Sequence, residues 1–273
     1  MKRVILLAII SLLFLNLNAQ EKEEKEKKYS LNGYISQMNQ TIIDSIDGDW
    51  INDGFINNRL KFNYFGIDNF TFNIQMRNRL IYGETVKYTP NYADYFENDR
   101  GFFDLSFNLA DGNSFVLNSN IDRAFFQFDI GKFQATIGRQ RINWGMTFVW
   151  NPNDLFNNYS FFDFDYVEKP GADAVNLQYF INYSSSIEFA AKLNSDTLLT
   201  TAMIYRFNMF SYDFQILGGM LDEQDIVVGF GWSGNISQLT FRGEASYLHP
   251  KDNFKDTSGI FIAPLGFDYM FSN

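Results

Sequence analysis

The chain has 273 residues, and 18% of them are aromatic, including 31 Phe, 15 Tyr and 4 Trp. It contains no Cys and one His, which excludes disulfide frameworks, thiolate zinc sites, cysteine nucleophiles and multi-histidine metal centres. The formal net charge is −10 and the hydrophobic fraction is 46%. After residue 20 no stretch approaches the ~20 apolar residues that a membrane helix needs, so a helical membrane bundle is excluded as well. We expect neither a metal nor a cofactor.

The N-terminus has the pattern of an export signal. Lys2 and Arg3 precede an apolar run over 4–15, and Ala19 offers a small residue for cleavage before Gln20. Residues 1–19 are therefore predicted to be a signal peptide; the alternative, an anchor helix, needs a longer apolar run. Residues 20–28 (QEKEEKEKK) have nothing to bury and are predicted to form a charged periplasmic tail.

From Tyr29 onward the hydrophobic period is two. The clearest case is 70–82, where Phe, Ile, Met, Leu and Tyr alternate with Thr, Asn, Gln and Arg, and 239–247 repeats the pattern. No helix is convincing. The sequence predicts about twelve strands, near 29–43, 59–64, 70–82, 121–130, 133–142, 172–182, 187–192, 198–209, 212–220, 225–233, 239–247 and 258–271.

The positions of the arginines decide between two all-β classes. Alternation alone also suits a soluble β-sandwich. Here the apolar faces are rich in Phe and Tyr, and the polar faces carry charge at mid-strand, as in a membrane barrel with lipid outside and water inside. Arg123 is the least regular case, because its face also contains Ile121 and Phe125. We assign these residues to the lining of a pore: Arg59, Arg77, Arg79, Arg123, Arg206, Arg242 and Glu244.

The connections fit an antiparallel transmembrane β-barrel over 29–273. Such barrels have short turns at one end and long loops at the other. The three longest gaps, 44–54, 84–118 and 143–171, all fall on the same end, although 102–109 alternates well enough to be a further strand. The chain also ends on Ser272-Asn273 rather than on an aromatic residue. We therefore expect the barrel to be incomplete at its C-terminus, as the first part of a larger one.

Residues 121–175 contain the most specific motifs. They include an IDR strand, a GRQ strand, Asn143-Trp144-Gly145, Asn-Pro-Asn-Asp at 151–154 and Glu-Lys-Pro-Gly-Ala-Asp at 168–173. This stretch resembles the large, mostly uncharacterised porin-like outer-membrane proteins of Gram-negative bacteria, a group similar to the alginate-export porins. The resemblance implies a monomeric or trimeric barrel of 16 or 18 strands with a passive transport role, and it does not supply a substrate.

The loop over 143–171 is too long and too aromatic to remain in solvent. We expect it to fold inward as a constriction, with polar residues facing the strand arginines: Asn143, Trp144, Asn151, Asn153, Asp154, Glu168, Lys169 and Asp173. Opposed charges across a narrow gap select solutes by charge and dipole. An equally good alternative is that these charges only pin the loop by ion pairs.

Arg139 and Arg141 do not fit the pattern. Strict alternation places them with Phe133, Ala135 and Ile137 on the lipid face. Either a bulge at Gly138 turns them inward, or the strand ends there at the membrane rim. The sequence does not choose between the two.

The predicted function is an outer-membrane, porin-like channel for passive transport of small polar or anionic solutes. The alternative is a plugged barrel that acts as an adhesin or a surface-polysaccharide scaffold. Expected partners are the lipid bilayer, lipopolysaccharide and the barrel-assembly machinery, with a homo-oligomer left open and no nucleic acid. No enzyme is expected, since a barrel hydrolase needs a strand-borne His and His249 lies in a predicted loop.

Overall fold

The fold is described from a computed structural model, which covers residues 27–43, 45, 48, 50–157, 170–252 and 254–271. The predicted signal peptide, most of the charged tail, and Glu168 and Lys169 lie outside these residues. Within them the chain forms one antiparallel sheet of fourteen strands with two short helices. The all-β prediction is confirmed at this level.

The sheet follows the order of the chain with two exceptions. The main path runs β1 (Tyr29–Ile43), β2 (Trp50–Ile67), β3 (Phe70–Gly83), β5 (Phe115–Ile130), β6 (Phe133–Gln140), β7 (Ala172–Asn182), β8 (Ser185–Leu193), β9 (Leu199–Met209), β10 (Tyr212–Leu221), β11 (Asp225–Ile236), β12 (Leu239–Pro250) and β13 (Ile260–Ile262). β4 (Ser106–Gly112) pairs with β5, and β14 (Leu265–Tyr269) pairs with β12.

Two differences from the predicted strand count have local causes. The sequence pattern of 102–109 fits either a loop or a further strand. In the structure this segment contains the start of β4, at Ser106. The predicted strand at 258–271 is broken at Ala263-Pro264, and its two pieces, β13 and β14, pair with different parts of β12. Pro264 lacks the N–H that an unbroken ladder needs.

The expectation of no helix was wrong. α2 (Glu84–Tyr88) and α3 (Tyr92–Glu97) follow β3. The Asp53 carboxylate on β2 accepts hydrogen bonds from the Thr85 backbone N–H (2.9 Å) and hydroxyl (2.5 Å), and this fixes the start of α2. Five and six residues are too short to show a hydrophobic period in the sequence.

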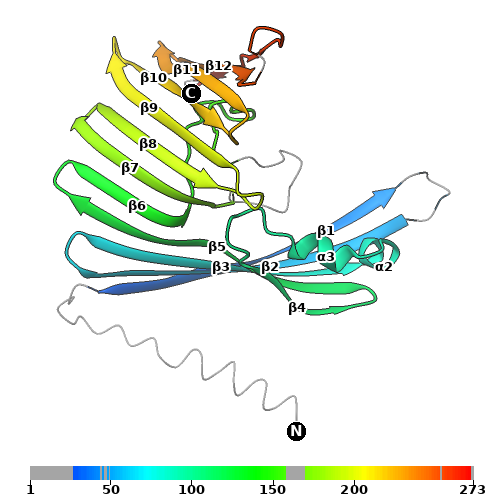
Figure 1. Ribbon diagram of the computed structural model, residues 1–273. Helices are drawn as coiled ribbons and strands as arrows, with labels where there is room; N and C mark the ends of the chain where they lie inside the picture. Colours follow the sequence, from blue (N-terminus) through cyan, green and yellow to red (C-terminus); the bar gives the residue numbers. More distant parts are fainter. Residues whose placement is uncertain are drawn as a thin grey trace.

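The sheet is bent but not closed among the described residues. Its path begins at β1 and ends at β13. Figure 1 shows β5 at the bend, with β6 to β12 rising on one side and β1 to β4 extending on the other. We call the inner face the one that carries Arg59, Arg77, Glu188 and Glu244, and the outer face its opposite. Closure into a barrel is therefore not shown.

The outer face is apolar, as the alternation predicted, whereas the inner face, which was expected to be polar, also buries apolar side chains. Small and branched apolar side chains of the inner face are buried: Ala174, Ala190, Ala202, Ile204, Leu217 and Val227. On the outer face large apolar side chains are exposed: Phe126, Phe128, Phe133, Ile137, Tyr179, Phe189, Tyr205, Ile216, Val228, Phe230, Tyr247 and Phe267.

Strand length divides the sheet into two regions. β1, β2, β3 and β5 have 14 to 18 residues, whereas β6 to β12 have 8 to 12. At ~3.3 Å per residue, the long strands extend well beyond the short ones. β4, α2 and α3 all lie on this extension (Figure 1).

Candidate functional site: the inner face and its loop

The strand arginines named from the sequence all lie on the inner face. Four of them, on β2, β3 and β5, belong to a polar network that we call the arginine network: Arg59, Arg77, Arg79 and Arg123, with Asn57, Gln75, Asn118 and Asp122. Its centre is an ion pair between Arg59 Nη2 and Asp122 Oδ2 at 2.7 Å. Arg59 also donates to Gln75 Oε1 from Nε (3.2 Å) and Nη2 (2.9 Å).

Asp122 reaches this face through a β-bulge. The pairing of β3 with β5 shifts between Gln75 and Met76, so that Ile121 pairs with Met76 and Arg123 with Gln75. The extra residue turns both Asp122 and Arg123 inward and moves Ile121 to the outer face. Arg123 Nη1 donates to the Asp122 carbonyl at 2.7 Å. The bulge resolves the irregularity at Ile121, while Phe125 stays on the inner face opposite Asn73.

The rest of the arginine network extends toward the helices. Arg77 Nη2 donates to Asn57 Oδ1 at 3.4 Å, and Arg79 Nη2 donates to Asn118 Oδ1 at 3.1 Å. The Arg79 guanidinium also lies 4.8 Å from the ring centre of Phe96 on α3. Because Arg59 is 1% exposed and Arg77 4%, these guanidinium groups are held inside the protein and do not face open solvent.

The second region of the inner face is covered by residues 143–157, which we call the inner-face loop. Ile142, Trp144, Leu155 and Phe156 form one apolar cluster with the buried side chains of β7 to β11. The Trp144 and Phe156 rings meet edge to face at 4.9 Å between centres. Figure 1 shows this green segment within the bend of the sheet. The described part of the predicted loop therefore folds inward.

Glu244 on β12 anchors the middle of the inner-face loop. Its Oε1 accepts hydrogen bonds from the backbone N–H groups of Met146 and Thr147 (2.9 Å for Thr147), and its Oε2 accepts one from Asn153 (3.0 Å). The Asn153 side chain donates to the Phe230 carbonyl at 3.1 Å and accepts from the Ser246 hydroxyl at 2.6 Å. Glu244 is 0% exposed, so it holds the loop and does not contact solvent.

Glu188 on β8 anchors the start of the same loop. Its Oε1 accepts from Trp144 Nε1 and from Asn176 Nδ2, each at 2.9 Å, and its Oε2 pairs with Arg206 Nη1 at 2.5 Å. Gln215 Nε2 donates to the Trp144 carbonyl at 2.7 Å. Trp144 is thus fixed at both its ring and its backbone.

Other residues of the loop contact one another or β12. Asn151 Oδ1 accepts from the Thr147 hydroxyl at 3.0 Å, and the Asp154 N–H donates to the Asn151 carbonyl at 3.1 Å. Arg242 lies 3.9 Å from the ring centre of Phe148 and pairs with Asp268 at 3.1 Å. These contacts are hydrogen bonds and packing rather than ion pairs of the loop charges, so both roles predicted for those charges stay predictions.

The sequence places Asp173 in the constriction, and the structure corrects this. Asp173 lies on β7 opposite Arg139, at a position that alternates with Ala174, and it is Ala174 that packs with the inner-face loop. Arg139 donates to Asp173 from Nε (2.9 Å) and Nη2 (2.7 Å) and pairs with Asp99 through Nη1 at 2.5 Å. Phe103 closes the cluster, since its N–H donates to Asp173 Oδ2 at 3.0 Å and its carbonyl accepts from Arg139.

The structure also shows how the chain runs around Arg139 and Arg141. Pairing continues through Gly138 without a register shift, so there is no bulge, although Gly138 has φ +119°. β6 ends at Gln140, which agrees with the second alternative as to the end of the strand; its position at a membrane rim stays a prediction. Arg139 is buried because the segment before β4 covers it, whereas Arg141 is exposed.

Several important residues were not singled out from the sequence. Glu188 and Gln215 sit at polar positions of alternating strands, so only the loop contact distinguishes them from neighbours. Asp122 was hidden by the bulge, which shifts the alternation by one residue. Asp99 lies in a segment with no strand pattern at all.

Two absences concern the described residues only. In that part of the chain no helix is long and apolar enough to cross a membrane. Within the same residues no three His, Cys, Asp or Glu side chains form a group that could hold a metal ion. No known family model matches the chain, and neither does any curated protein sequence.

Proposed function

We propose that the chain forms an outer-membrane, porin-like β-barrel for passive passage of small polar or anionic solutes. The observation that carries this proposal is the inversion of the two faces. Large apolar side chains are exposed on the outer face of β5 to β14, while charged and amide side chains are buried on the inner face. A soluble sheet would bury the first set, and an exposed apolar surface of this extent needs a nonaqueous environment.

Rows of aromatic rings support the same environment. Across β9 to β14 the outer-face rings meet in sequence, from Tyr205 and Phe207 through Phe214, Phe230 and Trp232 to Phe241 and Phe267, with centres 5.0 to 6.0 Å apart. Most of these residues lie near the short turns. Membrane barrels carry aromatic girdles at the level where lipid meets water.

The lengths of β7 to β12 support a membrane crossing as well. A strand tilted by ~45° needs about 9–11 residues to span the bilayer. These six strands have 9 to 12 residues. The proposal includes closure of the wall between the β1 edge and the β13–β14 edge, directly or through further strands.

A plugged barrel acting as an adhesin or polysaccharide scaffold is the second candidate, and a specific observation favours it. Inserted segments cover both regions of the inner face. Residues 143–157 pack on β7 to β12, and Val86, Tyr92 and Phe96 of the helices pack against Phe55, Ile81 and Val116 at the far end of the long strands.

Conductance separates the two candidates. The full chain is refolded into planar lipid bilayers, and single-channel currents are recorded under a KCl gradient. Stepwise openings with a stable conductance support a channel, and the reversal potential gives its ion preference. Insertion shown by protease protection in vesicles, without any stepwise current, would support the plugged scaffold. Failure to insert into lipid would contradict both.

A further inference from the structure

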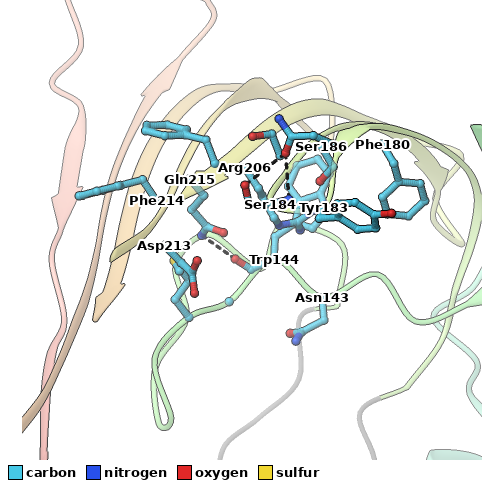
Figure 2. A pocket seen from close by; sticks show the side chains of 15 residues that line it. Asn143, Trp144, Phe180, Tyr183, Ser184, Ser186, Arg206, Asp213, Phe214 and Gln215 are labelled. Atoms are coloured by element: carbon cyan, nitrogen blue, oxygen red, sulfur yellow. Dashed lines mark hydrogen bonds between the residues drawn. The ribbon is translucent and has the colours of Figure 1, made fainter. Parts of the chain in front are cut away.

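A pocket of about 420 Å³ opens where the inner-face loop meets the turn ends of β7 to β10. Figure 2 shows it with Trp144 in the middle, Phe180 and Tyr183 on one side and Asp213 and Phe214 on the other. Its volume falls within the ~300–1,000 Å³ of pockets that hold small molecules. Of the residues named from the sequence, Asn143, Trp144 and Arg206 come together here.

The base of this pocket is held in place before any ligand arrives. The Trp144 ring is bonded to Glu188, its carbonyl accepts from Gln215, and Arg206 pairs with the same Glu188. Trp144 and Gln215 are buried. A ligand therefore does not need to order these side chains, which lowers the entropic cost of binding.

The pocket is chemically mixed and close to neutral. Arg206 is the basic group that lines it, but its charge is matched by Glu188 at 2.5 Å, and the exposed Asp213 contributes a carboxylate at the rim. Neutral donors and acceptors make up much of the rest: Asn143, Asn182, Ser184, Ser186 and Gln215. The one basic side chain of this lining is already paired, which disfavours a free anion, and a free cation meets Arg206 as well as Asp213 in the same lining.

Aromatic surface completes the lining. The Tyr183 and Phe180 side chains are both exposed at the same side of the pocket. Aromatic faces pack against C–H groups, while hydroxyl and amide side chains exchange hydrogen bonds with hydroxyl groups. Uncharged solutes that carry many hydroxyl groups on a carbon ring or chain offer both kinds of contact.

We propose that this pocket is a binding site for an uncharged, polyhydroxylated solute of about hexose size. The inference rests on the proposed function, because it names the class of solute that pauses at the turn end of the channel. It also narrows that function: the strand arginines are already paired with carboxylates or amides, and the pocket selects neutral solutes over anions.

Binding is tested on the refolded full chain in detergent micelles by saturation-transfer-difference NMR. The probes are D-glucose, D-glucuronate and D-glucosamine, which differ in charge. We expect saturable transfer to D-glucose and weaker binding of both charged analogues. Tyr183→Ala should weaken D-glucose binding about threefold to tenfold. Phe210→Ala, which removes an exposed ring from the neighbouring turn, is the matched control and should change nothing.

A second variant tests charge selection. Asp213→Asn should improve D-glucuronate binding severalfold while leaving D-glucose binding within about twofold. No transfer to D-glucose, equal effects of Tyr183→Ala and Phe210→Ala, or preference for D-glucuronate in the unaltered chain would overturn the pocket assignment. Conductance is recorded separately on the same preparations. A channel without D-glucose binding refutes this inference alone, whereas D-glucose binding without current refutes the channel and keeps the pocket.

Discussion

The inner-face side chains of the two regions of the sheet find their contacts in different ways. On β2, β3 and β5, polar side chains of the strands pair with one another, and the Arg59–Asp122 ion pair lies at their centre. On β7 to β12 the strands present small apolar side chains, and the inner-face loop supplies the groups that cover them. The centre of the first region is therefore held by its own strands, with the helices packed at its far end, whereas the second region depends throughout on a segment inserted from elsewhere in the chain.

The largest effect is expected at the centre of the arginine network. Asp122→Ala leaves Arg59 buried without this carboxylate, which should cost about 3–5 kcal/mol of unfolding free energy. Urea unfolding in lipid vesicles, followed by tryptophan fluorescence, measures it. The exposed turn variant Asp68→Ala is the control. If both variants are equally stable, the first region does not depend on this ion pair.

The outer face should respond next most strongly. Phe230 is exposed at the middle of β11, and Phe230→Arg should cost about 2–4 kcal/mol if that position faces lipid. Phe210→Arg, in the turn between β9 and β10, should be close to neutral. The same unfolding assay applies. Equal tolerance of both variants would argue against a lipid-facing wall and thus against the proposed function.

Release of the inner-face loop is the third test. Glu244→Gln removes the charge that receives three backbone N–H groups, and should cost roughly 1.5–3 kcal/mol. Limited proteolysis within 143–157 should accelerate, and channel current should rise if the loop narrows the pore. Glu223→Gln, at an exposed turn, is the control. Unchanged cleavage would show that the apolar contacts alone hold the loop.

The smallest effect is expected at the start of the loop. Trp144→Phe removes one hydrogen bond to Glu188, which keeps its contacts with Asn176 and Arg206, so about 1 kcal/mol should be lost. Trp150→Phe, in the same loop with an exposed ring, should have no measurable effect. If Trp150→Phe lowers the free energy of unfolding more than Trp144→Phe does, the described packing of the loop on the inner face is contradicted.

Most of the correct sequence predictions, namely strand bounds and the facing of the arginines, came from the alternation of apolar and polar side chains. The bounds of β1 and β7 agree with 29–43 and 172–182, and the arginines named as inward-facing all lie on the inner face. A period of two is a local property of one strand, so it can be recognised in the sequence without knowing which strands pair with it. The elements that it missed depend on distant contacts. α2 starts where Asp53 binds Thr85, and the bulge at Asp122 exists only in the pairing with β3.

Less of the candidate site than of the fold could be predicted from the sequence. Inward folding of the loop followed from its aromatic content, but the anchoring roles did not. The sequence assigns Glu244 to the pore lining, and Glu188 looks like any other polar residue of an alternating strand. Asp173 was misassigned for a related reason. It adjoins the loop in sequence, yet its partners Arg139 and Asp99 come from β6 and from the segment before β4.

The hydrogen bond from Met146 to Glu244 joins residues 98 positions apart in the chain. The segment that follows β6 thus binds to β12, a strand that is synthesised and paired much later. Contacts of such high sequence separation form late, since the intervening chain must be ordered first. Protection of residues 146–153 from proteolysis during refolding would therefore mark the moment at which assembly of the wall has reached β12.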